Sequence, residues 1–580
     1  MQNCLQFGKL RFTDNGMKMQ KEFVFYSTKE LDFPLSDEIE VLTQPRQNTH
    51  YLVSNAPEVE AIIYAPEINY YLAHSRDTIA QKIANVAKLY AIRSIGFDFA
   101  QDMDYEQSVG KKLLIITDDP SQEMLKKSLV DEGFAVVLLS PSMILDIDGH
   151  IGNLEVTLKK DDELFDLQTD QIIWDGKAPQ FAMKQSGVYD ISALGFEKAL
   201  EKVRHNEGSY HYKNYINYDP SICQYHERRV EVCGKCAEVC PTVAILKEDE
   251  TKHLVFSHID CHGCGGCISV CPSGALDYTQ MPRGAFFQLS SFYKNSIMLI
   301  IPHKMDLNTL DIPLKEGVLP FMIEGEKYLH EAHLLSLIQT SGHPVIFYTD
   351  FISKGTGDVI RMLNEIFERK YHKKAIHICQ TPAELEKIFE TMEALPECLY
   401  GINENGLRKR EIFSARLAHL VGEEDLGIVK AGEHVHYGDI VINEDKCTLC
   451  LSCVGACNVR ALTAHPEDNS LRFNASICTN CGYCEVTCPE KECLSVIKDE
   501  IHLKPSWFSQ RIMAKDELFA CIECGKEFAT TKSVQKIASL MTPLFGKDDV
   551  KIRTLYCCAD CKPKVMFKAH LQNEQEGVVL

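Results

Sequence analysis

CHGCGGCISVCPSGA occupies residues 261–275, and its four cysteines follow the spacing C-x2-C-x2-C-x3-C. The same spacing recurs at residues 447–457 and 478–488. A fourth quartet, at 223–240, differs by a long first gap and reads C-x9-C-x2-C-x3-C. Two-residue gaps let one short loop place three thiolates around a cube of iron and sulfur, and the fourth thiolate reaches the neighbouring cluster. We therefore predict four [4Fe–4S] clusters in place of buried free cysteines or a zinc cage.

The quartets form two tandem pairs that repeat one another. In each pair, 20 residues separate the last cysteine of the first quartet from the first cysteine of the second. Those residues predict a hairpin both times, because short apolar segments flank a polar turn. The sequence thus predicts two dicluster modules of the bacterial ferredoxin type.

The exchange of the fourth thiolate within each pair predicts the ligands of every cluster. In the first module the two expected sets are Cys223, Cys233, Cys236 and Cys271, and Cys261, Cys264, Cys267 and Cys240. In the second module they are Cys447, Cys450, Cys453 and Cys488, and Cys478, Cys481, Cys484 and Cys457.

Three residues depart from this pattern. An insertion that contains His226 displaces Cys223; if Cys223 is not a ligand, the cluster has three irons or His226 replaces that thiolate. Asn458 stands where proline usually follows the fourth cysteine, which costs turn rigidity but no ligand. Cys493 lies beyond a complete quartet and is interpreted as a bystander.

The C-terminal cysteines follow another rule, since CIECGK (521–526) and CADCK (558–562) are two C-x2-C pairs. Two such pairs build a tetrahedral tetrathiolate site, the geometry typical of structural zinc. We expect one zinc ion, with a further iron–sulfur site or an empty pair as alternatives. The expected zinc ligands are Cys521, Cys524, Cys558 and Cys561. The cysteines without an expected ligand role are Cys4, Cys379, Cys398, Cys493 and Cys557, the last ambiguous because it adjoins Cys558.

Composition limits the possible partners and compartment. The 580 residues include 61 Lys and Arg against 82 Asp and Glu, which gives a formal net charge of −21. An acidic surface disfavours general nucleic-acid binding, because phosphates require a positive field. The N-terminus lacks the apolar segment of a secretion signal, and no apolar run approaches the roughly 18 residues of a membrane span. We therefore expect a cytoplasmic protein whose 25 cysteines remain reduced.

Two regions outside the cysteine blocks have the pattern of open α/β sheets. LLIIT (113–117) and AVVLL (135–139) predict buried parallel strands joined by a helix over 121–132. No G-x-G-x-x-G follows the first strand, so a dinucleotide or flavin site there is unsupported. Further along, the expected strands are 297–301, 345–348 and 375–379, and the expected helices are 326–340, 357–370 and 382–393.

Two motifs in the second of these regions are interpreted as structural. SKGTGD (353–358) lacks the Gly-Lys-Ser/Thr of a phosphate loop and predicts a plain connection. In His330-Glu331-Ala332-His333 the histidines are three residues apart, so the motif is not H-E-x-x-H and predicts a partly exposed helix face. No nucleophile–base constellation stands out, and no catalytic residue is predicted.

The ordered motifs resemble a known family. They are C-x9-C-x2-C-x3-CPT at 223–242, CHGCGGCISVCPSGA at 261–275, DKCTLCLSCVGAC at 445–457, CTNCGYCEVTCPEK at 478–491 and the terminal CIECGKEF…CCADC. This set resembles the proteobacterial multi-cluster ferredoxins, which have two dicluster modules and a zinc-ribbon-like tail. The resemblance implies a redox partner protein such as a molybdenum- or tungsten-dependent formate dehydrogenase. Residues 296–400 are similar to the iron–sulfur δ subunit of electron-bifurcating hydrogenase–heterodisulfide reductase systems, which implies a docking scaffold here, since only Cys379 and Cys398 remain.

Together these patterns predict a multidomain chain of α/β and α+β type. The expected parts are an N-terminal α/β region (1–210), a first dicluster module (211–285), an α/β domain (290–435), a second dicluster module (436–500) and a zinc-ribbon-like domain (510–570). The expected function is electron transfer as a polyferredoxin. The alternatives are an assembly or regulatory factor for a molybdoenzyme, and a non-catalytic subunit of a bifurcating oxidoreductase.

Overall fold

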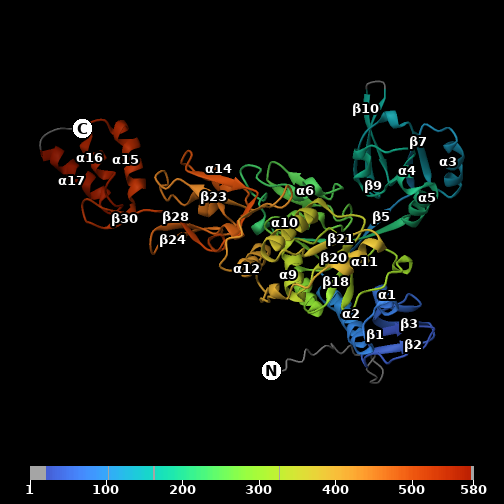
Figure 1. Ribbon diagram of the computed structural model, residues 1–580. Helices are drawn as coiled ribbons and strands as arrows, with labels where there is room; N and C mark the ends of the chain where they lie inside the picture. Colours follow the sequence, from blue (N-terminus) through green and yellow to red (C-terminus); the bar gives the residue numbers. More distant parts are fainter. Residues whose placement is uncertain (1–20, 102, 161–162, 326, 576–580) are drawn as a thin grey trace, which may run out of the picture.

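The described chain contains three four-stranded parallel sheets and two cysteine-rich modules (Figure 1); two sheets precede the first module, and the third lies between the modules. The structure is a computed structural model that describes residues 21–101, 103–160, 163–325 and 327–575. The mixed α/β, multidomain architecture expected from the sequence is thereby confirmed. Cys4 lies outside the described residues.

The first sheet has the strand order β2-β1-β3-β4, with all neighbours parallel. Its elements are β1 (Phe23–Tyr26), β2 (Ile39–Leu42), β3 (Arg46–Ser54), β4 (Val59–Tyr64), α1 (Pro66–His74) and α2 (Ile79–Phe99). The capping box of Thr78 and Gln81 starts α2, because each side chain bonds the other's backbone amide. The buried face of α2 joins the large core shared with the central domain.

A second α/β domain is inserted between two antiparallel strands, β5 (Asp104–Val109) and β13 (Gly208–Lys213). Its parallel sheet has the order β12-β11-β6-β7, and a three-stranded antiparallel sheet, β10-β9-β8, packs against it. The elements are β6 (Lys112–Ile116), α3 (Gln122–Asp131), β7 (Ala135–Leu139), β8 (Ile144–His150), β9 (Asn153–Lys160), β10 (Glu163–Thr169), β11 (Gln171–Trp174), β12 (Val188–Asp190), α4 (Ile191–Leu194) and α5 (Phe196–His205). The predicted β-α-β unit over 113–139 is confirmed in its parallel pairing. The predicted burial of 135–139 is wrong, because β7 is the edge strand of its sheet and none of its residues is buried. Residues 21–210 hold two separate parallel sheets.

The central domain contains the third sheet, β19-β18-β20-β21, in which every neighbouring pair is parallel. Its elements are α8 (Arg283–Ser290), β18 (Ile297–Pro302), β19 (Val318–Ile323), α9 (Glu331–Ser341), β20 (Val345–Tyr348), α10 (Lys354–Tyr371), β21 (Ile376–Cys379), α11 (Pro382–Thr391) and α12 (Lys409–Val421). The predicted connection at 353–358 is wrong. Ser353 caps α10 by accepting from the amide of Thr356, so the glycines of that motif lie in the first turns of a helix.

The two modules repeat one arrangement of a terminal strand pair, a hairpin and two short helices. Module 1 has β14 (Ile216–Tyr218) paired with β17 (Leu276–Tyr278), the hairpin β15 (Ile245–Glu248) and β16 (His253–Phe256), and α6 (Lys235–Val239) and α7 (Gly266–Val270). Module 2 has β23 (Gly438–Ile442) paired with β26 (Leu494–Lys498), the hairpin β24 (Leu462–His465) and β25 (Ser470–Phe473), and α13 (Ser452–Ala456) and α14 (Tyr483–Thr487). Both predicted hairpins are confirmed. Module 2 adds β22 (Ile428–Lys430), β27 (Glu500–His502) and β28 (Arg511–Lys515).

The chain finishes in a small domain of one hairpin and three helices, at the opposite end of Figure 1 from the inserted domain. It comprises β29 (Leu518–Ala520), β30 (Glu527–Thr530), α15 (Thr531–Phe545), α16 (Asp549–Thr554) and α17 (Lys562–Gln575). Among the described helices, none combines the length and the apolar character needed to cross a membrane.

Candidate iron–sulfur and metal sites

Four cavities in the two modules are each lined by four quartet cysteines. Site A contains Cys223, Cys233, Cys236 and Cys271, and site B contains Cys240, Cys261, Cys264 and Cys267. Site C contains Cys457, Cys478, Cys481 and Cys484, and site D contains Cys447, Cys450, Cys453 and Cys488. In every site the structure gathers the set expected from exchange of the fourth cysteine. That these thiolates ligate clusters stays a prediction.

Cys223 lies in site A in spite of the insertion that displaces it in sequence. The alternative ligand His226 is engaged elsewhere, since its Nδ1 lies 2.9 Å from Nδ1 of His253. The backbone amide of Tyr225 donates to Sγ of Cys223 over 3.4 Å. This arrangement favours a complete four-thiolate site over a three-iron or histidine-ligated one.

Three of the quartets share an unusual backbone path. The second residue after the first cysteine and the first residue after the second cysteine both have left-handed φ angles. The pairs are Gly263 (64°) and Gly265 (76°), Leu449 (52°) and Leu451 (62°), and Asn480 (55°) and Gly482 (80°). Leucine is strained in this region, so site D adopts the ligand loop at an energetic cost that site B avoids with glycine.

This path turns backbone amides toward the sulfur atoms. The amide of Asn480, which lies on this path, donates to Sγ of Cys478 over 3.3 Å; outside the path, the amide of Ala461 donates to Sγ of Cys457 over 3.3 Å. The amide of Gly263 likewise acts on Cys261 and opposes the rise of its pKa. Such donors favour the thiolate form and, around a cluster, set its reduction potential.

The donor chemistry of the sites fits iron–sulfur clusters. Burial raises the pKa of the Cys236 thiol well above its ordinary value, and the neighbouring sulfur of Cys271 raises it further. Burial and the other sulfurs do the same for Cys267 in site B. Four buried thiolates therefore repel one another unless a cationic centre lies between them, and iron supplies that charge.

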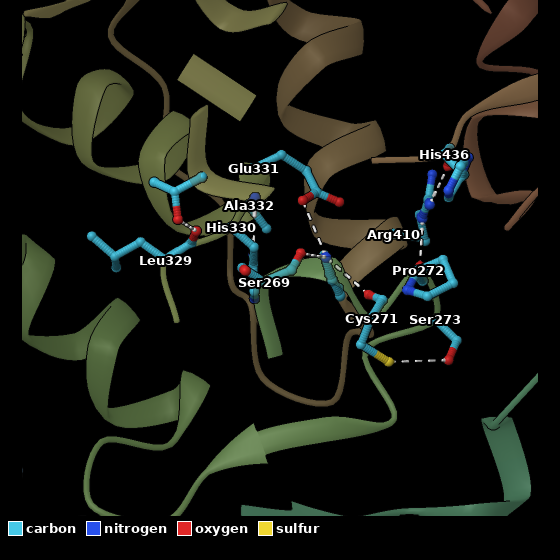
Figure 2. Close-up of polar contacts among 12 residues, drawn as sticks. Ser269, Cys271, Pro272, Ser273, Leu329, His330, Glu331, Ala332, Arg410 and His436 are labelled. Carbon is cyan, nitrogen blue, oxygen red and sulfur yellow. Dashed lines mark hydrogen bonds and ion pairs between the residues drawn. The ribbon is translucent and has the colours of Figure 1, made fainter. Parts of the chain in front are cut away.

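A buried ion pair of the central domain anchors the Cys271 loop of site A. Lys409, the first residue of α12, donates from Nζ to the carbonyl oxygens of Cys271 (2.9 Å) and Ser269 (3.3 Å). The same Nζ lies 3.1 Å from a carboxylate oxygen of Glu331, as drawn around Glu331 and Cys271 in Figure 2. Arg410 donates from Nε to the carbonyl oxygen of Pro272 over 2.6 Å.

The predicted exposed face of His330-Glu331-Ala332-His333 is wrong, because these residues are buried at the start of α9. The ring of His333 lies against Phe286, with 4.3 Å between centroids, and the ring of His330 stacks on it at 3.7 Å. Burial and nearby cationic side chains hold the pKa of both imidazoles well below its ordinary value. The motif therefore forms part of the core beside site A.

The four C-terminal cysteines predicted to hold zinc lie together. The sulfurs of Cys521, Cys524, Cys558 and Cys561 are all within 4.8 Å of one another. Sγ of Cys524 and Sγ of Cys558 are 3.8 Å apart, which equals the edge of about 3.8 Å of a tetrahedron with Zn–S bonds of roughly 2.3 Å. Burial alone would raise the pKa of Cys521, but donation from backbone amides, that of Cys558 first, lowers it to about 6. The set fits a structural tetrathiolate metal site.

The remaining described cysteines differ in their surroundings. Cys557 is buried beside Cys521 and donates from Sγ to the carbonyl oxygen of Arg553, and it is not among the four cysteines whose sulfurs gather for a metal. Cys379 and Cys398 are buried in the central domain, where burial raises the pKa of each thiol to about 12. Cys493 lines the cavity of site D beside its four cysteines, a proximity that the sequence pattern did not reveal.

Site B lies beside the inserted domain, and site D lies beside the terminal domain. Beside site B, the amide and hydroxyl of Ser186 in the inserted domain both donate to the carboxylate of Asp260 over 2.8 Å. Beside site D, Thr530 and Ser533 of the terminal domain donate to the carbonyl oxygen of Thr448 over 2.9 and 2.7 Å. Cys450 of site D is exposed.

Comparison with known proteins identifies both modules. Residues 231–275 and 439–489 match families described as 4Fe-4S dicluster domain. A protein of Nitratidesulfovibrio vulgaris (strain Hildenborough), whose name states no activity, is 41% identical over 51 residues, which cover 8% of this chain. The chain spans only 14% of that relative's length. The protein therefore contains two 4Fe–4S dicluster domains and a C-terminal cluster of four cysteines.

Proposed function

We propose that this protein is a polyferredoxin that relays electrons through four [4Fe–4S] clusters to or from a redox enzyme. The observation that supports it most is the gathering of sixteen quartet cysteines into sites A to D, four per site. Each cluster, when bound, would take up and release one electron at a time. The residues named in each site would be its ligands.

The chain's own groups would tune these centres. Backbone amides donate to cysteine sulfurs in sites A and C, which stabilises negative charge there. The buried ammonium of Lys409 lies beside the Cys271 loop and favours additional negative charge in site A. Hydrogen bonds to the sulfurs and a nearby positive charge raise the reduction potential of a cluster. Burial of a cluster without such donors lowers its potential.

We further propose a structural zinc ion at Cys521, Cys524, Cys558 and Cys561, in a zinc-ribbon-like domain. With four thiolates no position remains for a substrate, so the metal would stabilise the fold of the domain. The central domain would act as a docking scaffold, since its cysteines Cys379 and Cys398 are buried and separate from the sites. A molybdenum- or tungsten-dependent formate dehydrogenase is the partner that the family resemblance suggests.

The competing proposals are an assembly or regulatory factor for a molybdoenzyme and a non-catalytic subunit of a bifurcating oxidoreductase. The test is anaerobic purification from native cells with accompanying proteins, addition of formate, and observation of iron–sulfur absorbance. Rapid bleaching in a complex with a molybdoenzyme supports the proposed role as an electron carrier. Clusters that dithionite reduces but formate does not, beside an active dehydrogenase, contradict it for that enzyme and favour assembly. A bound flavin would favour the bifurcating complex.

A further inference from the structure

Sites A and C lie against each other where the two modules meet. Gln224, which follows Cys223 of site A, lines the cavity of site C. Asn458, which follows Cys457 of site C, reaches back toward site A. The residues next to one cysteine of each site therefore form the contact between the modules.

Asn458 links the two sites through hydrogen bonds at both ends of its amide. Its Nδ2 donates to the carbonyl oxygen of Cys223 over 2.9 Å and to that of Ser221 over 3.2 Å. Its Oδ1 accepts from Nε2 of Gln224 over 2.6 Å. A continuous path therefore runs from site A to site C. It consists of the covalent bonds of Cys223, one hydrogen bond, and the covalent bonds of Asn458 and Cys457.

The surroundings of this path are packed and fixed by further contacts. Arg228 of module 1 donates from a guanidinium nitrogen to the carbonyl oxygen of Ala456 over 2.7 Å. Its guanidinium also lies 4.5 Å from the ring centroid of Tyr483 in module 2. Gln224 and Arg228 are buried. The contact therefore excludes most water and holds the hydrogen bond of Asn458 in one geometry.

Asn458 is also where the repeat departs from its own pattern. Pro241, Pro272 and Pro489 follow the fourth cysteine in the other three quartets. Proline has no side-chain donor, so only asparagine among these four residues can bond across to another module. Without proline the turn after Cys457 is less rigid, but Asn458 forms a hydrogen bond to the backbone of Cys223 in site A.

We propose that Asn458 is the coupling residue through which electrons cross between the two modules. The inference rests on the proposed electron-transfer function. One electron leaves site C and arrives at site A, or the reverse, and no bond or proton changes. With Asn458 joining A and C, the sites form a line in the order B, A, C, D. The inserted domain then flanks one end of the line and the terminal domain flanks the other.

The order can be tested by voltammetry of the full-length protein, attached to an electrode through a tag at its C-terminus. Electrons then enter near site D, and module 1 fills only across the contact between A and C. At slow scan rates all four clusters contribute to the current. Above a threshold scan rate the contribution of module 1 disappears, and that threshold measures the exchange between the modules.

Two variants remove the bond in different ways. Asn458→Pro restores the residue found after the other fourth cysteines, and Asn458→Leu keeps an uncharged side chain of similar size but loses the Nδ2 donor. Both are expected to retain iron, electron paramagnetic resonance signals and midpoint potentials, and to lower the threshold scan rate severalfold. Arg228→Lys is the matched control, because it loosens the same contact but leaves the Asn458 bond, and its threshold is expected to match the parent.

A second arm does not depend on how Asn458 variants fold. Removing site C with Cys481→Ala/Cys484→Ala is expected to leave only site D in rapid exchange with the electrode. Removing site B with Cys261→Ala/Cys264→Ala is expected to leave the other three. The proposal is overturned if Asn458 variants that retain their iron transfer electrons between the modules as fast as the parent. It is also overturned if module 1 still exchanges electrons rapidly with the electrode after site C is lost. Absence of any reversible reduction in the parent instead overturns the proposed function itself.

Discussion

The ammonium nitrogen of Lys409 lies 3.1 Å from the carboxylate of Glu331 and donates to the carbonyl oxygen of Cys271 over 2.9 Å. Lys409 begins α12 and Glu331 begins α9, so the first residues of two central helices meet at the last cysteine of module 1. Both side chains are at most 2% exposed. The central domain thereby holds the ligand loop of site A with a desolvated ion pair.

Replacing Lys409 by methionine is expected to destabilise the protein by about 3–5 kcal/mol, because it leaves the charge of Glu331 buried and unpaired. The double variant Lys409→Met/Glu331→Gln is expected to recover much of that loss. The measurement is urea unfolding of each single variant, the double variant and the parent. Strictly additive losses would contradict a direct interaction between the two side chains.

Three glycine substitutions are expected to separate steric overlap from backbone strain in the modules. Gly265 has φ +76°, and a Cβ there would lie 2.4 Å from Cβ of Tyr328, so Gly265→Ala is expected to prevent assembly of site B. Gly482 has φ +80° with open space around it, so Gly482→Ala is expected to cost only about 1 kcal/mol.

Gly455 is the matched control, since it lies in α13 and a Cβ there meets nothing within 4 Å. Gly455→Ala is expected to leave iron content unchanged. Iron and sulfide analysis of the three anaerobically purified variants makes the comparison. Equal iron loss in Gly265→Ala and Gly455→Ala would show that the close approach of Tyr328 does not constrain site B.

The terminal metal site predicts different outcomes for neighbouring cysteines. Cys524→Ser is expected to lose the metal and unfold the terminal domain, because structural zinc contributes directly to folding. Cys557→Ser is expected to retain both, since Sγ of Cys557 points to the carbonyl oxygen of Arg553. Zinc analysis and limited proteolysis report the two effects. Metal loss in Cys557→Ser with retention in Cys524→Ser would reverse the assignment.

Acid is expected to destabilise the core beside site A. His333 is buried with its pKa held well below the ordinary value, whereas in the unfolded chain it titrates near pH 6.5. The unfolded state therefore binds the additional proton, and stability falls as pH drops below about 6.5, by about 1.4 kcal/mol per pH unit for this group.

His333→Phe removes that proton and is expected to reduce the loss of stability between pH 7 and pH 5. The exposed His303 provides the control, and His303→Phe is expected to follow the parent. Urea unfolding followed by far-UV circular dichroism at both pH values measures the difference. An unchanged pH dependence in His333→Phe would mean that His333 is protonated in the folded protein.

The cysteine groupings could be predicted from sequence because ligand spacing is local and repeats. Even the displaced Cys223 falls in its expected set, and the hairpins of both modules follow from short apolar segments around a turn. In the α/β regions, continuous apolar runs predicted the strands at 113–117, 135–139, 297–301, 345–348 and 375–379 but none of β1 to β4.

Tertiary contacts explain what the sequence did not reveal. Polar residues in His330-Glu331-Ala332-His333 suggest exposure, but their burial depends on Lys409, 78 positions away, and on the aromatic side chains of α8. Asn458 was visible only as a missing proline, because its partner, Cys223, is 235 positions distant. Cys493 lies beside site D because β26 pairs with β23, a long-range pairing.

A reductive titration of the anaerobically purified full-length protein, followed by electron paramagnetic resonance with iron, sulfide and zinc analysis, shows whether the four quartet sites hold redox-active clusters. We expect four [4Fe–4S] clusters and one zinc per chain, with every cluster reversibly accepting one electron. Quartet sites that bind zinc in place of iron and sulfide, or clusters that no reductant reduces reversibly, would contradict that expectation.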